Sequence, residues 1–209
     1  MSPFGIALEA FDRCDPQSIA AVRQQYGDRI IVSVGRLVYY KGFEYLIRAM
    51  TEVQGKLLII GDGPLRNRLR ELVSELGLGD RVHFLGRVSH ETLVACYHSS
   101  VAFVLPSVAR SEAFGIVQIE AMAAGIPVVN TQLDSGVPFV SVHEKTGLTV
   151  PPGDPHALAG AINRLLADKN LAESLGKAAG QRARQEFSLQ TMVSKTLALY
   201  EAVRAQGHH

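Results

Sequence analysis

The sequence contains only two cysteines, Cys14 and Cys96. Their spacing fits neither a metal site nor the disulfide framework of a small secreted domain. Cys96 lies in a stretch of helical character, where we expect a small buried side chain. Apolar runs of about 18 residues are also absent, and the amino terminus lacks the charged and apolar regions of a signal peptide. These absences predict a cytoplasmic protein that does not span a membrane.

Neither positive nor negative charge is in excess. The chain has 21 lysines and arginines and 20 aspartates and glutamates, for a formal net charge of +1. This balance argues against nucleic acid as a partner, since binding to a phosphate backbone requires a basic surface. The motifs G-x-G-x-x-G and G-x-x-x-x-G-K-[ST] are missing, which argues against a dehydrogenase and an NTPase. With 209 residues, 47% of them apolar, the chain is long enough for one domain with a single core.

Five apolar runs alternate with amphipathic segments, and each has the length of a buried strand. The expected strands are residues 30–34, 56–60, 81–85, 101–105 and 127–130. This alternation predicts an α/β fold with a doubly wound, Rossmann-like parallel sheet covered by helices on both faces. Ligands bind such sheets at the edge where the strands end. Unusual residues follow the strands at that edge: Gly35-Arg36, Gly61-Asp62-Gly63, Gly86-Arg87 and Pro106-Ser107.

Local signals also predict helix starts and the organisation of the carboxyl-terminal part. Pro64 is typical of the first position of a helix, and Ser89 is typical of an N-cap. Beyond Val150 the apolar spacing predicts a helix, then a polar stretch rich in Ala and Lys, then a final helix over residues 187–203. The terminal His208-His209 is interpreted as a tag remnant.

Two glutamates, Glu112 and Glu120, stand eight positions apart around Phe114-Gly115-Ile116, where a strand gives way to a helix. Glu112 falls in the loop and Glu120 in the body of the helix, so we expect both carboxylates to face one crevice at different depths. The helix start between them offers backbone N–H groups, a natural seat for a phosphate.

This spacing resembles the E-x7-E signature of retaining glycosyltransferases of the two-domain GT-B fold, in the family 4 also called group 1. Further motifs stand around it in family order, and residues 28 to 170 match. They are Ser33-Val-Gly-Arg-Leu37 with Lys41-Gly42, Ile60-Gly-Asp-Gly-Pro64, Val82-His-Phe-Leu-Gly86, Val104-Leu-Pro-Ser107, Glu120-Ala-Met-Ala-Ala-Gly125 and Val150-Pro-Pro-Gly-Asp154.

The resemblance implies that the chain is the carboxyl-terminal, sugar-donor-binding half of a GT-B fold with extra carboxyl-terminal helices. Residues 1–27 would hold the interdomain strand and lead-in, 28–170 the nucleotide-sugar-binding domain, and 171–209 the last helices and the tag remnant. The acceptor-binding amino-terminal domain would be missing, and any peripheral membrane association would run through that half. The loop of Glu112 and the apolar side of the last helix, with Leu197, Leu199 and Tyr200, would face it.

The catalytic residues implied by the resemblance are Arg36, Lys41 and Glu112. Arg36 and Lys41 would bind the diphosphate and stabilise the charge that builds there as it leaves. Glycine at position 35 would let the backbone approach the ligand closely. Glu112 would contact hydroxyls of the transferred sugar.

The substrate-binding residues implied by the resemblance are Gly35, Val88, Phe114, Gly115, Ile116 and Glu120. Glu120 would hold the ribose hydroxyls. The N–H groups of Phe114, Gly115 and Ile116 would meet sugar and phosphate, and the backbone around Val88 would read the base.

No D-x-D motif is present, so we expect no metal and no cofactor beyond the nucleotide-diphospho-sugar itself. The expected function is sugar transfer from a UDP- or GDP-sugar to a saccharide or lipid-linked acceptor in surface polysaccharide biosynthesis, with the isolated chain inactive. A GT-B-related nucleotide-sugar epimerase or phosphorylase and a non-catalytic nucleotide- or protein-binding domain stay open as alternatives. The sequence departs from the family pattern at Ala113 and in the loop 133–139, which leaves the diphosphate contacts of that loop open.

Overall fold

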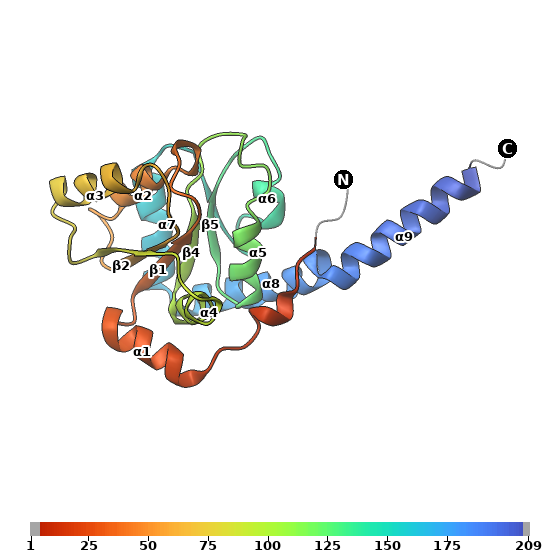
Figure 1. Cartoon of the computed structure of the whole chain (residues 1–209), viewed down its shortest axis with the longest axis horizontal. Coiled ribbons are helices and arrows are strands. Elements are labelled where there is room, and N and C mark those ends of the chain that lie inside the picture. Colours follow the sequence, from red (N-terminus) through yellow and green to blue (C-terminus); the bar gives the residue numbers. More distant parts are fainter. Residues whose placement is uncertain (1–4, 207–209) are drawn as a thin grey trace.

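The computed structural model describes residues 5–206, which form a parallel sheet with helices on both faces (Figure 1). The sheet has six strands in the order β3-β2-β1-β4-β5-β6, and all neighbours are parallel. The strands are β1 (Ile30–Val34), β2 (Lys56–Ile60), β3 (Val82–Gly86), β4 (Ala102–Leu105), β5 (Val128–Thr131) and β6 (Gly147–Val150). The predicted doubly wound α/β fold is confirmed.

The five predicted strands agree with β1 to β5 to within one residue at each end. The sixth strand, β6, was missed, because it is four residues long and begins at a glycine, which weakens a strand pattern. The glycine has a packing reason. A Cβ at Gly147 would collide with the carbonyl oxygen of Val128 on β5, so the close approach of these two strands requires the absence of a side chain.

Helices cover the sheet in two layers, each with its own apolar core. One face carries α2 (Phe43–Ala49), α3 (Arg66–Glu75) and α7 (Pro155–Ala167), and the other carries α1 (Pro16–Tyr26), α4 (His90–Ser99), α5 (Ile116–Ala123) and α6 (Val137–Val140). Strand side chains alternate between the layers: Ile31 and Ile59 lie in the first core, and Ile30 and Leu58 lie in the second. Both faces are apolar because both are buried.

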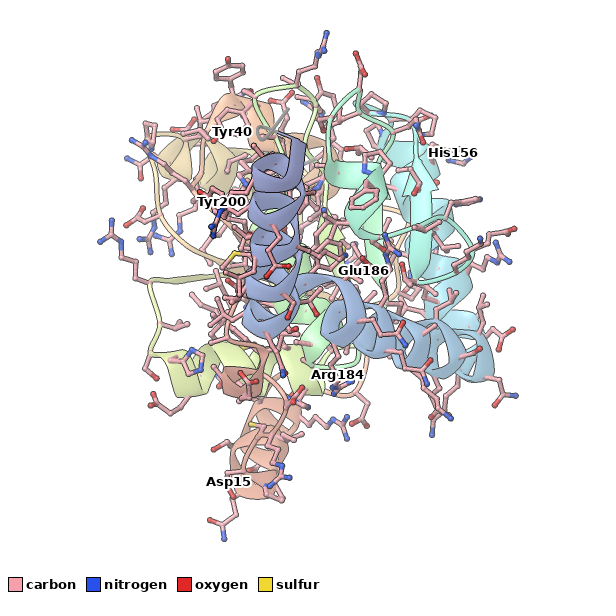
Figure 2. The ribbon with its side chains drawn as sticks, turned by 90° about the vertical axis from the view of Figure 1, so that its right-hand side faces the viewer. Asp15, Tyr40, His156, Arg184, Glu186 and Tyr200 are labelled. Carbon is pink, nitrogen blue, oxygen red and sulfur yellow. The ribbon has the colours of Figure 1, made fainter. Side chains whose placement is uncertain are left out.

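The polar stretch rich in Ala and Lys is a helix, α8 (Lys169–Phe187), which passes from the first core, at Leu175, to the second, at Phe187. Ser188 is extended, and its hydroxyl accepts a hydrogen bond from the N–H of Thr191, which caps the following helix α9 (Leu189–Gln206). The prediction of one helix from residue 187 was therefore wrong at its start. Figure 1 shows α9 projecting away from the sheet, and Figure 2 shows Glu186 near the bend.

Other local predictions have mixed outcomes. Ser89 caps α4 as predicted, since its hydroxyl accepts from the N–H of Thr92 at 3.2 Å. Cys96 is buried on α4, also as predicted. The prediction for Pro64 was wrong, because α3 begins at Arg66. Within residues 5–206, none of the helices combines the length and the apolar character that a membrane crossing requires.

Some of the predicted features fall at the chain ends. The tag remnant at His208-His209 and residues 1–4 of the expected interdomain strand lie outside the described residues. The described part of that segment contacts the bend between α8 and α9. There, the N–H of Ile6 donates to the carbonyl of Phe187 at 3.0 Å, and the carbonyl of Ile6 accepts from the N–H of Leu189 at 3.2 Å.

The strand order places a topological switch point between β1 and β4. The chain leaves β1 toward one side of the sheet and returns to the other side of β1 at β4. In open α/β sheets, ligands bind at the crevice that such a reversal creates. The loops that follow β1 and β4, residues 35–41 and 106–115, flank this position.

Candidate functional site

The two loops at the switch point are joined by close backbone contacts. The N–H of Val108 donates to the carbonyl of Tyr40 at 2.8 Å. Gly42 has a positive φ of 67°, and a Cβ there would collide with the carbonyl oxygen of Pro106. Glycine is therefore required at this turn both by its conformation and by the approach of the second loop. The contacts fix the position of the short 3-10 helix η2 (Tyr39–Lys41) against the loop after β4.

Lys41 and Glu112 form a buried ion pair across the switch point. The ammonium of Lys41 lies 2.5 Å from Oε2 of Glu112, and the two side chains are only 12% and 9% exposed. Ser107, which is fully buried, donates its hydroxyl to the same carboxylate oxygen at 2.9 Å. Thr131 at the end of β5 in turn donates to the carbonyl of Ser107 at 2.6 Å. The structure thus brings two of the predicted catalytic residues together in one network.

Gly35 belongs to the same cluster, whereas Arg36 stands apart. A Cβ added at Gly35 would lie 3.7 Å from the ammonium nitrogen of Lys41, so the backbone of Gly35 and the Lys41 ammonium are neighbours. Arg36 is exposed, and within residues 5–206 its guanidinium has no hydrogen bond or ion pair. The charge of Lys41 is matched by Glu112, so Arg36 is the uncompensated cation of the loop that follows β1.

The segment Phe114-Gly115-Ile116 leads into α5 as predicted. Gly115 has a φ of 64°, and its missing side chain leaves room for Leu105 and Gln118. No side chain caps α5, as is also the case for α2, α3 and α6, whereas α4, α7 and α8 are capped by Ser89, Asp154 and Asp168. The first turn of an uncapped helix presents N–H groups to an anion.

The loop 133–139, which departs from the family pattern, packs directly against this segment. The N–H of Gly136 donates to the carbonyl of Ala113 at 2.8 Å, and a Cβ at Gly136 would meet the ring of Phe114. Asn130 holds the start of α6 by donating to the carbonyl of Val137 at 3.2 Å. The loop is thus fixed beside the start of α5.

Glu120 lies outside the Lys41 network and has a different partner. Tyr97 on α4 donates its hydroxyl to Oε2 of Glu120 at 2.9 Å. Burial raises the pKa of the Glu120 carboxyl, while the hydrogen bond from Tyr97 and the charge of His90 lower it. The structure therefore separates the two glutamates into two environments.

Val88 is half-buried and packs against the second core, directly after β3. Gly86 ends that strand with a φ of 69°. Its carbonyl accepts from the N–H of Gly61 at 2.7 Å, which ties the loops after β2 and β3 together. The predicted base-contacting segment is thus at the same edge of the sheet as the Lys41 network, but on the far side of β1 from β4.

The family described as "Glycosyl transferases group 1" matches residues 16–182. The chain belongs to this family. The predicted family and the GT-B type of fold are confirmed. Among relatives, the chain is 36% identical to the D-rhamnosyltransferase WbpZ of Pseudomonas aeruginosa, over 88% of this chain and 48% of that protein. It is 31% identical to the O-antigen chain mannosyltransferase C of Escherichia coli, over 95% of this chain and 53% of that protein.

A solved structure agrees with this assignment. The fold matches Anabaena Alr3699/HepE in complex with UDP-glucose with a TM-score of 0.86 and 25% identity, over 95% of this chain and 56% of that chain. This group 1 chain therefore spans about half of the length of the curated relatives that it matches.

The sequence of this group 1 chain did not identify Ser107 and Tyr97 as polar residues of the candidate site. Ser107 follows β4 directly, and its place at the strand end was the available signal. Tyr97 offered no signal, because its contact with Glu120 depends on how α4 and α5 pack on the sheet. Within the described chain, no group of three or more His, Cys, Asp or Glu side chains is arranged to hold a metal ion.

Proposed function

We propose that this chain is the nucleotide-sugar-binding half of a retaining glycosyltransferase that transfers a sugar from a UDP- or GDP-sugar to a saccharide or lipid-linked acceptor. The observation that carries the proposal is the buried Lys41–Glu112 pair at the switch point, beside the uncapped start of α5. A diphosphate needs positive charge and N–H groups, and a sugar needs hydrogen-bond acceptors for its hydroxyls. Both kinds of group occur at this one edge of the sheet.

Arg36 and Lys41 are assigned to the diphosphate. The exposed Arg36 is free to make the first contact with the anion, and Lys41 can share its charge between Glu112 and a phosphate oxygen. Negative charge grows on the leaving phosphate as the glycosidic bond to the nucleotide breaks, so fixed cations there favour the transition state over the ground state. These two side chains and the start of α5 supply the positive charge, and the proposal includes no metal or other cofactor.

The family resemblance implies the remaining contacts, and the positions of Gly35, Glu112 and Val88 at one edge of the sheet support them. Glu112 accepts from hydroxyls of the transferred sugar and orients its reacting carbon. The N–H groups of Gly115 and Ile116, with that of Phe114, meet the sugar and the phosphate. Gly35 allows the ligand to approach the backbone, the segment at Val88 contacts the base, and Glu120 accepts from the ribose.

The partner of this half is an amino-terminal domain that binds the acceptor and completes the cleft. Residues 1–27 are assigned to the interdomain strand and its lead-in, residues 28–170 to the binding of the sugar donor, and residues 171–209 to the last helices and the tag remnant. Any peripheral membrane contact runs through the acceptor half. The name of the E. coli relative, an O-antigen chain mannosyltransferase, supports a role in surface polysaccharide biosynthesis. Water stays in an open cleft, so the isolated chain is expected to bind nucleotide without transferring sugar.

Thermal unfolding of the chain with UDP-, GDP-, ADP- and dTDP-sugars tests the proposal. A ligand at 100 times its dissociation constant should stabilise the fold by about 2.7 kcal/mol. The variant Arg36→Ala should lose most of this stabilisation. Lys177→Ala, which removes an exposed lysine of α8, is the matched control and should behave as the wild type. A chain that is stabilised by none of the four sugar nucleotides would contradict the proposed function.

A further inference from the structure

Tyr97 is the bulkiest of the fully buried side chains. It lies on α4, and its ring makes edge contacts with Phe11 and Phe103, at centroid distances of 6.3 and 6.0 Å. A hydroxyl in such apolar surroundings must find a partner, because leaving it without one costs free energy. The partner is the carboxylate of Glu120 on α5.

A purely structural explanation would make Tyr97 a core residue whose hydroxyl happens to be satisfied. Two neighbouring buried hydroxyls find partners four residues back in the sequence: Ser99, the last residue of α4, donates to the carbonyl of Ala95, and Ser100, which follows α4, to that of Cys96, both at 2.7 Å. Tyr97 reaches a charged group on another helix instead. A carboxylate in this position opposes folding, since burial raises its pKa. The hydrogen bond from Tyr97 therefore stabilises a negative charge on Glu120 that the packing of the core does not require.

The geometry leaves part of the carboxylate available. Tyr97 binds Oε2, and within residues 5–206 no other hydrogen bond or ion pair to Glu120 is present. Burial and the carboxylate hold the pKa of the Tyr97 hydroxyl well above its ordinary value, so this group remains a hydrogen-bond donor. Glu120 must then face it as an acceptor, with Oε1 open to a further donor.

We infer that Tyr97 is a positioning residue for nucleotide recognition: its hydroxyl orients the Glu120 carboxylate so that the free oxygen accepts from the ribose diol. This inference rests on the proposed function, which places the ribose at Glu120. It adds a residue from a helix that carries none of the residues assigned to the sugar donor. It also predicts that discrimination between ribose and 2′-deoxyribose depends on a hydroxyl that does not touch the ligand.

The test uses Tyr97→Phe, which keeps the ring packing and removes only the hydroxyl. UDP, GDP and their 2′-deoxy forms are titrated into both proteins by calorimetry. The wild type should prefer the ribonucleotide by about tenfold or more, the scale of a hydrogen bond to a charged group. Tyr97→Phe should lose most of this preference while binding the 2′-deoxy form with unchanged affinity. Tyr26→Phe, which removes the hydroxyl of a tyrosine that packs on His83, is the matched control.

A second measurement needs no ligand. In protein labelled with 13C-glutamate, the pKa of Glu120 should rise in Tyr97→Phe and stay unchanged in Tyr26→Phe. His90 is the other titratable group whose charge acts on Glu120, so both titrations are repeated in His90→Gln. In wild-type protein labelled instead with 13C-tyrosine, the ring carbon that carries the Tyr97 hydroxyl should follow the same titration, and Glu120→Gln should abolish it.

The outcomes separate the two claims. Absence of any nucleotide binding by the wild type would overturn the proposed function and the ribose contact with it. Equal discrimination against 2′-deoxynucleotides in the wild type and in Tyr97→Phe would overturn only the role of Tyr97. An unchanged pKa of Glu120 in Tyr97→Phe would do the same without reference to any ligand.

Discussion

Glu112 and Glu120 are both glutamates and stand eight positions apart in the sequence, but their surroundings in the fold differ. The carboxylate of Glu112 is paired with the ammonium of Lys41 at 2.5 Å and also accepts from Ser107. Glu120 has no cation as a partner within the described residues and contacts a neutral phenol. The first arrangement neutralises a charge and joins two loops. The second keeps a charge oriented and available. The two glutamates of the signature therefore have different partners: one is in an ion pair, and the other accepts a hydrogen bond from a phenol.

Removing the Glu112 carboxylate should have the strongest effect, because it takes away the partner of a buried cation. Glu112→Ala leaves the Lys41 ammonium, on a side chain only 12% exposed, without its partner, which costs about 3–5 kcal/mol of unfolding free energy. Lys41→Met/Glu112→Leu removes both charges, and we expect it to recover most of this stability but not nucleotide binding. Urea unfolding and calorimetry measure the two quantities, with Lys177→Ala on the exposed side of α8 as the control. Recovery of nucleotide binding in the double variant would show that the pair is only structural.

Steady-state kinetics of the full-length enzyme should distinguish the roles of the two cations and the two glutamates. Arg36→Ala and Lys41→Ala should each lower turnover by roughly 10²- to 10³-fold, the scale for one preorganised transition-state contact. Glu112→Ala should also lower kcat, because sugar orientation sets the attack geometry. Glu120→Ala should raise KM more than it lowers kcat, since a ribose contact is the same in ground and transition states. Near wild-type turnover in both cation variants would refute their assigned roles.

The pH dependence of stability tests the surroundings of Glu120. The folded-state pKa of Glu120 is raised by burial above its ordinary value of 4.5, so the folded state binds the proton more tightly than the unfolded state. Ionisation of Glu120 therefore destabilises the fold. The free energy of unfolding of the wild type should fall relative to Glu120→Gln as pH rises from about 4.5 through the folded pKa. Nucleotide affinity should rise over the same range, because ribose recognition uses the ionised form.

The check is a series of urea unfolding experiments on both proteins across this pH range. The difference between the two proteins isolates Glu120, since the other titrating groups are shared. A difference that is independent of pH would mean that the surroundings of Glu120 do not shift its pKa.

The smallest effect is expected far from the glutamates, at the surface that would face the second domain. Side chains on α9 expose apolar area at Leu197, Leu199 and Tyr200, which are 57%, 60% and 66% exposed. Figure 2 labels Tyr200 on this helix. Uncovered apolar patches promote association, so we expect the isolated chain to self-associate at high concentration. Leu197→Glu should shift the mass measured by analytical ultracentrifugation toward the monomer. Ser194→Glu, a change on the polar side of α9, should not, and a strictly monomeric wild type would contradict the expectation.

The amino-acid sequence alone predicted most of the elements and the edge of the sheet at which the candidate site lies. Apolar runs identified five of the six strands because strands buried on both faces need apolar side chains throughout. Ser89 correctly predicted a helix start, because its hydroxyl accepts from a backbone N–H group only three residues away. Sequence signals failed at two positions where packing determines the local structure. Gly147 begins β6 because a neighbouring carbonyl leaves no room for a side chain, and Pro64 precedes α3 without starting it.

Which of the candidate residues meet depends on the tertiary fold. Lys41 pairs with Glu112 because β4 lies beside β1, and that adjacency follows from a strand order that skips β2 and β3. Tyr97 reaches Glu120 because α4 and α5 pack on the same face of the sheet. Local patterns report periodicity and caps, which depend on neighbours a few residues away. Contacts between distant segments depend on strand order and helix packing, which the whole chain selects by burying both faces of the sheet at once.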